Sequence, residues 1–571
     1  MTSATDLLPT LLPTLRAIVG KRHLLTTKSQ TERYTSGFRF GSGPVLAVVR
    51  PGSLVEQWRV LQACHQAQVI MIMQAANTGL TGGSTPDGDA YDRPIVLINT
   101  LRLAKLHLIN QGRQVVCLPG ATLFQLEQAL RPLNREPHSV IGSSCLGASV
   151  LGGIANNSGG ALLRRGPAFT QLALFARVTM ENKLELVNHL GIRLGDAPEE
   201  MLTKLESGQF AEAEIEHDDT RFASAHDYEE QVRDIHAPTA ARFNADPHRL
   251  YEASGSAGKM MIFAVRLDSF EKDQRTKTFY IGTRNPDELT QIRRHILETF
   301  KTLPVSAEYI HRDAFNIAAV YGKDIFLAIA HFGTDRLPKL FALKAKIDRI
   351  SHYFKFLPDH LSDKLMQWAS HLFPQHLPAR MLDYRDRYEH HLLLKMPGDG
   401  IAEAQSYLTS LFPSDQGDFF ECSEAEASKA FLHRFAVAGA AVRYRTMHAQ
   451  ETSDIVALDI ALRRDELQWQ EHLPAEIDKT LLHKLYYGHF FCHVFHQDYV
   501  VAKNHDPIEI EHKMWALLDQ REAQYPAEHN VGHLYNAKPA LAAHYRDLDP
   551  CNCFNSGIGK TSKLFCWQES E

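Results

Sequence analysis

Two glycine-rich loops in the N-terminal half have the composition of a site for a large ligand with an anionic part. The first, Ala75–Pro86, follows the apolar run Val69–Met73 and holds three glycines, four hydroxyl side chains and no charged residue. Small residues let the backbone approach a ligand, and successive N–H groups can bind an anion such as pyrophosphate. The spacing is neither G-x-G-x-x-G nor a P-loop, which argues against a Rossmann or nucleoside-triphosphatase site. For this loop alone, a tight structural turn is the alternative.

The second loop, residues 142–160, is too polar for a core and too apolar for a plain surface loop. Long glycine-rich loops in compact domains are usually functional, and the backbone groups of such a loop suit the edges of a flat ring system. A third element, residues 255–258, leads into the apolar run Met260–Leu267. The recurrence of these loops favours a binding site over isolated turns.

Short apolar runs between glycine-rich turns predict an α+β domain around these loops. Strands are predicted at Val69–Met73, Ile95–Ile98 and Val115–Leu118, a helix after Thr122, and a hairpin from Leu172–Val178 and Leu184–Val187. Residues 196–233 are acidic and poor in aromatics, which predicts a solvated insertion.

From Lys277 the pattern changes to two strand-then-helix units, 278–300 and 391–412, which predict a second α/β domain. Between them, residues 311–387 are rich in cationic and aromatic side chains. This composition fits a platform for an anionic membrane surface, where cations meet lipid headgroups and aromatics enter the interface. A solvated helical cap is the alternative. The first pattern returns only near the C-terminus.

Composition sets outer limits on the fold and on partners. A chain of 571 residues exceeds the size of a single hydrophobic core, so at least two domains are expected. A net charge of -6 argues against a general nucleic-acid binder. Eight cysteines, of which only Cys551 and Cys553 are close neighbours, form no metal or redox motif and indicate a reducing, cytosolic setting. The N-terminal residues do not predict a secretory signal, and no segment is apolar enough to span a bilayer, so any membrane contact should be peripheral.

In order and spacing, the three glycine-rich elements resemble the FAD domain of the vanillyl-alcohol-oxidase and p-cresol-methylhydroxylase superfamily. Thr78–Gly83 resembles its pyrophosphate loop, Asn157–Gly160 its flavin-facing loop and Gly255–Gly258 its third contact. The resemblance implies an α+β fold with a two-part FAD-binding domain and an α/β cap domain. It also implies non-covalent FAD contacts, at Ala75, Ala76, Asn77, Thr78, Gly79, Gly83, Ser84, Gly142, Ser149, Gly159 and Ile262.

A second resemblance concerns the chemistry. Residues 527–532 resemble the E-H-G-x-G motif of the D-2-hydroxy-acid dehydrogenase branch, with Asn530 in place of glycine. Oxidising such an acid needs a base for the hydroxyl proton and a cation for the carboxylate. The resemblance implies that His529 is the base, with Glu528 beside it, and that Arg434 binds the carboxylate. Arg443 and Arg445 are weaker candidates. For each arginine, a structural role is the alternative.

His489 and His496 match the first and last histidines of that branch's G-H-x-G-D-G-N-x-H motif. In metal-dependent relatives these two histidines and the glutamate of the previous motif, here Glu528, bind a divalent ion. Two imidazoles and a carboxylate are a reasonable ligand set. Residues 490–495 lack the G-D-G-N turn, so the alternative, in which the histidines bind substrate or stabilise the sheet, stays open.

Over nearly its whole length, including residues 486–489 and 529–535, the chain resembles a family of bacterial FAD dehydrogenases that oxidise D-lactate to pyruvate. The resemblance implies ubiquinone or menaquinone as acceptor and peripheral attachment to the anionic, cytoplasmic face of the inner membrane. The implied domains are 1–267 (FAD), 268–310 (cap, first part), 311–387 (membrane-binding insertion), 388–519 (cap, second part) and 520–571 (return to the FAD domain). The alternatives are another D-2-hydroxy acid, such as 2-hydroxyglutarate or glycolate, or a non-catalytic flavin-fold protein at the membrane surface.

Overall fold

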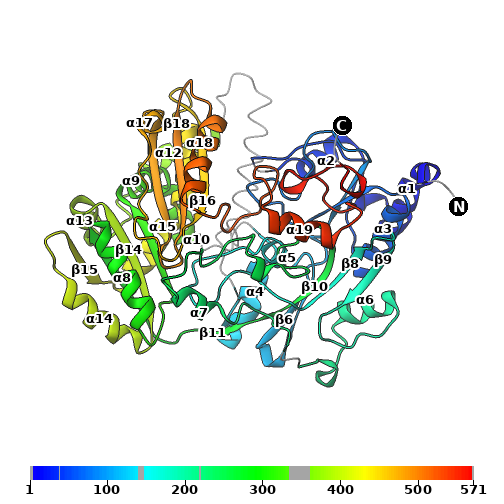
Figure 1. Ribbon diagram of the computed structural model, residues 1–571, viewed down its shortest axis with the longest axis horizontal. Coiled ribbons are helices and arrows are strands. Elements are labelled where there is room, and N and C mark those ends of the chain that lie inside the picture. The colour runs from blue at the N-terminus through cyan, green and yellow to red at the C-terminus, as the bar shows by residue number, and fades with distance from the viewer. Residues whose placement is uncertain (1–3, 38, 139–146, 218–219, 333–360, 569–571) are drawn as a thin grey trace.

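The structure, a computed structural model, describes the chain except residues 1–3, 38, 139–146, 218–219, 333–360 and 569–571. Three main sheets organise it. Two smaller sheets, at the right of Figure 1, form the N-terminal domain together with the C-terminal segment, and a seven-stranded cap sheet lies at the left. The C-terminal segment thus packs with the N-terminal sheets, apart from the cap sheet, and the predicted domain bounds stay predictions.

The first small sheet has the strand order β1-β2-β4-β3. Its strands are β1 (Leu24–Leu25), β2 (Ala47–Val49), β4 (Ile95–Asn99) and β3 (Ile70–Gln74). β2, β4 and β3 are parallel, and their almost continuous apolar sequences are buried, as a parallel sheet covered on both faces requires. Helices α1 (Ala4–Val19) and α3 (Leu54–Gln66) pack in the same core, and α2 (Lys28–Thr35) precedes β2.

The second small sheet is antiparallel, in the order β5-β6-β10-β8-β9. Its strands are β5 (Leu106–Ile109), β6 (Gln114–Cys117), β10 (Met261–Asp268), β8 (Ala173–Val178) and β9 (Leu184–Asn188). Helices α4 (Leu123–Leu130), capped by Thr122, and α5 (Val150–Ala155), capped by Ser149, pack against it. A short ribbon joins β7 (Arg135–Glu136) to β11 (Phe270–Glu271).

The prediction of a solvated insertion at residues 196–233 is wrong. This segment forms α6 (Pro198–Ser207) and α7 (Tyr228–Arg233). Leu202 and Leu205 of α6 lie in the core of the N-terminal domain, whereas Tyr228 and Val232 of α7 are buried in the core under the cap sheet. Between the acidic side chains, apolar residues recur at helical spacing, and these apolar side chains pack in the cores of both domains.

The cap sheet is antiparallel, in the order β15-β12-β14-β13-β17-β18-β16. Its strands are β12 (Thr276–Thr283), β13 (Ser306–His311), β14 (His390–Pro397), β15 (Gly417–Glu421), β16 (Thr452–Ala461), β17 (Leu481–His489) and β18 (Val494–Ala502). Both predicted strand-then-helix units are confirmed, with α8 (Pro286–Thr299) after β12 and α14 (Gly400–Leu411) after β14.

Helices cover both faces of the cap sheet. One core contains α8, α14 and α18 (Pro507–Gln520), with α17 (Ala475–Asp478) near the edge, and the other contains α9 (Arg312–Tyr321), α13 (Ala379–Arg387), α15 (Glu424–Phe435) and α16 (Val437–Met447). α10 (Lys323–Phe332) and α12 (Leu361–Ser370) contact each other beside α9 and α16. Both ends of the predicted insertion 311–387 thus pack in the cap. Most of the basic side chains on which the prediction of a membrane platform rests lie outside the described residues. Within the described chain, no helix is long and apolar enough to cross a bilayer.

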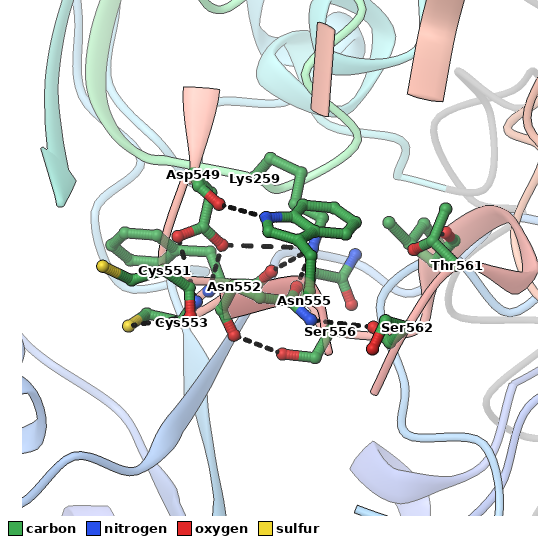
Figure 2. Close-up of polar contacts among 12 residues, drawn as sticks. Lys259, Asp549, Cys551, Asn552, Cys553, Asn555, Ser556, Thr561 and Ser562 are labelled. Carbon is green, nitrogen blue, oxygen red and sulfur yellow. Dashed lines mark hydrogen bonds and ion pairs between the residues drawn. The ribbon is translucent and has the colours of Figure 1, made fainter. Parts of the chain in front are cut away.

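The C-terminal segment returns through α19 (Pro539–Leu548) and a tail that is anchored on one buried lysine. Figure 2 shows Lys259 against this tail: its Nζ donates to Asn552 Oδ1 at 2.6 Å and to the Phe554 carbonyl at 2.9 Å. Lys259 Nζ also lies 3.9 Å from Asp549 Oδ2, and both side chains are fully buried.

Asn555, on the same tail, connects two of the glycine-rich loops. Its Nδ2 donates to the carbonyls of Gly83 at 2.9 Å and Ala257 at 2.7 Å. The third loop in turn contacts the second, because the Ala257 N–H donates to the Ala155 carbonyl at 2.8 Å. The three loops predicted to hold one ligand therefore meet in space.

Candidate active site

Two carboxylate–histidine pairs lie across neighbouring strands of the cap sheet. Glu308 on β13 stands opposite His489 at the end of β17, and Asp459 on β16 stands opposite His496 on β18. Because directly opposed side chains on a sheet are close neighbours, the ladder itself brings each acid to a histidine. Nδ1 of His489 donates to Glu308 Oε1 at 2.6 Å, and Nδ1 of His496 lies 3.4 Å from Asp459 Oδ1.

The segment 528–529 is held onto this sheet by Asp459. Oδ2 of Asp459 accepts from the backbone N–H groups of Glu528 at 2.7 Å and His529 at 3.0 Å. The same oxygen accepts from Nδ1 of His529 at 2.6 Å. Since Nδ1 is used in this way, Nε2 is the nitrogen of His529 that remains for a substrate.

The same segment lies against the glycine-rich loops. A Cβ at Gly159 would come within 2.2 Å of Glu528 Oε1, and one at Gly83 within 2.1 Å of Asn530 Nδ2. Arg242 joins the two sides, since its Nη2 donates to Glu528 Oε1 at 2.5 Å and also to the Gly160 carbonyl. The predicted catalytic segment therefore contacts the predicted pyrophosphate and flavin-facing loops.

His489, His496 and Glu528 converge on one position, as the predicted ligand set requires. Their nearest ligand atoms all lie within 4.8 Å of one another. Nε2 of His489 is 3.4 Å from Glu528 Oε2, and Nε2 of His496 is 3.9 Å from the same oxygen. Each histidine presents its Nδ1 to a carboxylate, which is the arrangement that orients metal-binding imidazoles in proteins. The donor set fits a divalent cation.

The charges of this cluster depend on one another. Burial would lower the pKa of His489, but the carboxylates of Glu308 and Glu528 raise it to about 10. Burial would raise the pKa of Glu528, yet Arg242 and His489 hold it well below its usual range. For His496, burial prevails and lowers the pKa despite Asp459. A proton on His489 or a cation in its place therefore balances the buried carboxylates.

His529 is the most accessible member of the cluster. Its side chain is 38% exposed, against 12% for His489 and 7% for Glu528. Burial opposes protonation of His529, but Asp459 outweighs it and raises the pKa. An imidazole that is both accessible and made more basic by a buried carboxylate has the properties of a general base.

Arg434, the predicted carboxylate-binding residue, lies on α15 beside this cluster. Its Nη2 is 3.1 Å from Glu308 Oε2, and its guanidinium lies 4.6 Å above the ring of Tyr487. Its Nε has no hydrogen-bond partner among the described residues. The weaker candidates are paired elsewhere: Arg443 with Asp324 and Asp363, and Arg445 with Asp454.

The sequence matches two families. One is described as "FAD binding domain", over residues 45–181, and the other as "D-lactate dehydrogenase, membrane binding", over residues 278–567. The quinone-dependent D-lactate dehydrogenase of Escherichia coli (strain K12) is 58% identical over 98% of this chain and 97% of that protein. The protein of the same name from Haemophilus influenzae is 57% identical over 98% of this chain and 99% of that protein. The chain belongs to the quinone-dependent D-lactate dehydrogenase family.

Comparison with solved structures identifies the fold of this member of the family. p-Cresol methylhydroxylase with bound substrate superposes with a TM-score of 0.57 at 12% identity, covering 97% of both chains. 4-Ethylphenol oxidase from Gulosibacter chungangensis gives 0.55 at 12% identity, covering 99% of this chain and 98% of that one. The predicted α+β fold class and the vanillyl-alcohol-oxidase type of FAD domain are confirmed, and FAD is the cofactor.

The first loop has backbone N–H groups that no described residue accepts from, as a site for the pyrophosphate of FAD requires. Among the described residues, none accepts a hydrogen bond from the backbone N–H groups of residues 75–79. A Cβ at Gly79 would meet no atom within 4 Å in the part of the chain that the structure describes, and Asn77 adopts a positive φ of 54°. Unpaired donors around open space suit a pyrophosphate. Ser84 supports this shape, since its Oγ donates to Asn77 Oδ1 at 3.1 Å.

The other predicted cofactor contacts lie in the second loop and on β10. The Ser149 hydroxyl caps α5 by accepting from the Gly152 N–H, and Ile262 is buried in β10 with its carbonyl bonded to Gln57. Gly159 has its space filled by Glu528, and Gly142 lies outside the described residues. All of the predicted cofactor contacts, those of the first loop included, stay predictions.

Three residues that sequence reasoning missed hold the site of this D-lactate dehydrogenase family member together: Asp459, Glu308 and Arg242. None belongs to a motif that was considered, and each acts on residues far along the chain. Asp459 and Glu308 did carry one signal, because each is an acid flanked by apolar residues within a predominantly buried strand. An acid buried in this way needs a partner.

Proposed function

We propose that the chain oxidises D-lactate to pyruvate and passes the electrons to a membrane quinone, as the names of its relatives describe. The observation that carries the proposal is His529, half exposed and held by Asp459 next to the flavin-facing loop. The three loops would hold FAD, which would supply the acceptor for the hydride (one proton and two electrons) that leaves C2 of the substrate.

The residues of the chain supply the acid–base chemistry. Nε2 of His529 takes the hydroxyl proton, and the carboxylate of Asp459 stabilises the imidazolium that forms. Arg434 binds the substrate carboxylate through the part of its guanidinium that Glu308 does not occupy. The segment 528–530, packed on Gly159 and Gly83, keeps the base against the loops that would hold the cofactor.

The proposal is tested by rapid mixing of the purified flavoprotein with D-lactate, L-lactate, glycolate and D-2-hydroxyglutarate. We expect D-lactate to bleach the flavin absorbance fastest. Faster reduction by one of the other acids would reassign the substrate, and reduction by none of them would overturn the proposed activity.

We further propose that His489, His496 and Glu528 hold a divalent cation beside the substrate hydroxyl. A bound cation would lower the pKa of that hydroxyl and assist His529. Elemental analysis of the purified protein should find about one equivalent of a divalent metal, and His489→Gln should reduce that content. A wild-type protein that is fully active without a metal would contradict this proposal. In that case the proton on His489 would balance the charge of the buried carboxylates.

The membrane contact is proposed at α12 and the turn after it. Trp368, Leu372 and Phe373 are 64%, 70% and 52% exposed. Exposed aromatic and aliphatic side chains next to a cationic segment suit the interface of an anionic bilayer. The seven cysteines among the described residues are free thiols, which favours the reducing, cytoplasmic face. Sedimentation with vesicles of anionic or zwitterionic lipid tests which lipid the protein binds. Reoxidation of the reduced flavin by the same vesicles, loaded with ubiquinone or menaquinone, tests the acceptor.

A further inference from the structure

Two cysteines at opposite ends of the C-terminal tail, Cys551 and Cys566, share a backbone contact. The N–H of Cys566 donates to the carbonyl of Cys551 at 3.0 Å. With standard bond lengths, this contact keeps the two Cα atoms within about 7 Å of each other, which a disulfide can span. The fold therefore brings together two thiols that are not neighbours in the sequence.

The two thiols differ in their access to solvent. Cys551 is only 2% exposed, whereas Cys566 is on the surface. Burial and the adjacent thiol of Cys566 raise the pKa of Cys551 to about 11, so the buried thiol stays protonated. Because a dissolved oxidant reaches an exposed thiol first, Cys566 is the member of the pair that reacts, with Cys551 next to it.

The backbone of residues 566 and 567 holds the exposed thiol in this place. Cys566 and Trp567 adopt positive φ angles of 52° and 60°, which are uncommon for residues other than glycine. Nε1 of Trp567 donates to the Asp549 carbonyl at 2.8 Å, and its ring centroid lies 4.4 Å from Nζ of Lys259. A backbone of this kind persists only where such contacts hold it. The Cys566 thiol is therefore kept next to Cys551.

A bond between the two sulfur atoms would leave no acceptor unpaired. The S–H of Cys551 donates to the Thr179 carbonyl at 3.4 Å, and this bond would be lost. The same carbonyl also accepts from the N–H of Asn182 at 2.9 Å, so it keeps a partner. Because the loss of a hydrogen bond is costly mainly when it leaves a buried group unsatisfied, the pair can be linked at little cost.

We propose that Cys551 and Cys566 are a reversible oxidation site, at which hydrogen peroxide converts two thiols into a disulfide. The Cys566 thiolate attacks one oxygen of the peroxide, becomes a sulfenic acid and releases hydroxide, which takes up the thiol proton as water. The Cys551 sulfur then displaces the sulfenic oxygen, which leaves as a second water. Two thiols and one peroxide thus give one disulfide and two waters, and a dithiol reductant restores the thiols. The proposal is independent of the function proposed above, since these thiols lie outside the candidate active site.

The disulfide would close the segment that joins the cofactor loops. Asn555 lies between the two cysteines, and its Nδ2 donates to the carbonyls of Gly83 and Ala257. Asn552, in the same segment, accepts from the buried Lys259, as Figure 2 shows. A covalent link around these contacts restricts the unfolded tail. The tail and the loops that it joins should therefore open at a higher temperature in the oxidised protein.

The test uses the purified, FAD-bound protein. It is treated with hydrogen peroxide, its remaining thiols are alkylated, and it is digested without reductant. Mass spectrometry should find the peptides of residues 551 and 566 joined. The melting temperature should rise by about 3–5 °C, and the release of FAD on heating, followed by flavin fluorescence, should shift upward with it. Dithiothreitol should reverse both shifts.

Cys566→Ser is the deciding variant, because the side chain is exposed and its replacement disturbs no core. This variant should fold normally and lose both the link and the temperature shifts. Cys553→Ala removes a buried thiol from the same segment, one that lies 4.0 Å from Nη1 of Arg93, and is the matched control. It should keep the link between residues 551 and 566.

Three results would overturn the proposal. The first is a folded, peroxide-treated wild type in which Cys566 is unmodified or oxidised to a sulfinic acid without a link. The second is a link between any other two cysteines. The third is a linked protein whose melting temperature and FAD release are unchanged, since the disulfide would then not stabilise the tail.

Discussion

Glu528 occupies the space that a side chain at position 159 would need, with its Oε1 2.2 Å from the place of the missing Cβ. Position 159 is therefore glycine because the carboxylate of the distant E-H motif lies on it. This contact brings the proposed base next to the flavin-facing loop, and it explains why a glycine-rich loop and a motif about 370 residues away in the chain form one site.

Gly159→Ala should separate these two parts. The added methyl group displaces Glu528 and with it the bond from Arg242. We expect flavin reduction by D-lactate to fall by about 10²-fold, as expected for a displacement of about 1 Å at a reacting centre. Gly439→Ala, in α16, would meet the flexible end of the Ile325 side chain and no other described residue, and it is the control. An unchanged rate in Gly159→Ala would show that Glu528 does not position the site.

Gly79→Ala locates the cofactor. A methyl group there meets no atom of the described residues within 4 Å, so the apoprotein should be as stable as the wild type. If FAD fills that space, the variant should bind it at least about tenfold more weakly, a loss of about 1.4 kcal/mol. Titration of deflavinated protein with FAD measures this directly. Wild-type affinity would place the cofactor away from Gly79.

Replacing the proposed base should separate binding from chemistry. His529→Ala removes the proton acceptor but none of the loop contacts, so FAD should remain bound while its reduction by substrate slows by about 10²- to 10⁴-fold. Stopped-flow measurement of flavin bleaching gives the rate, and the absorbance spectrum gives the FAD content. Unchanged reduction kinetics would rule out His529 as the base.

Lys259→Met should destabilise the N-terminal domain. It leaves Asp549 buried without its cation, a change that costs about 3–5 kcal/mol in comparable buried pairs. Thermal melting of the FAD-bound protein measures the effect. Lys277→Met, which removes the lysine of an exposed pair with Glu421, should change the melting temperature little. Equal effects of the two substitutions would contradict a special role for the buried pair.

The same lysine predicts a pH dependence. Burial lowers the pKa of Lys259 from its ordinary value of 10.5 to about 8. Between these values the unfolded chain binds more protons than the folded one, so stability increases with pH across this window and is lost as pH falls through 8. The difference in melting temperature between wild type and Lys259→Met should therefore grow from pH 7.5 to pH 9.5 in favour of the wild type. A constant difference would exclude the shift.

Trp368→Ser should weaken the membrane contact without changing catalysis. Trp368 is 64% exposed on α12, and we expect the partition coefficient into anionic vesicles to fall by about tenfold. Met180→Ser alters a side chain that is 81% exposed on the N-terminal domain and should leave partitioning unchanged. Equal losses in both variants would show that the contact is not localised at α12.

The sequence by itself determined the features that depend on local chemistry. The glycine-rich loops, the apolar strands β3, β4 and β6, the cap on α4 and the E-H motif are all recognisable, because backbone access, β-pairing and helix capping each require particular residues within a few positions. The α+β fold class followed from these patterns, and FAD from the resemblance of the loops to a known superfamily.

Only the tertiary structure decided which distant groups act on these features. Asp459, Glu308 and Arg242 approach His529, His489 and Glu528 because neighbouring strands and a returning C-terminal segment bring them together. Their pKa shifts and tautomers arise from burial and from partners 70 to 286 residues away, and no local pattern encodes such distances. The packing of the 196–233 segment was missed for the same reason, since its apolar side chains meet their partners only in the folded chain.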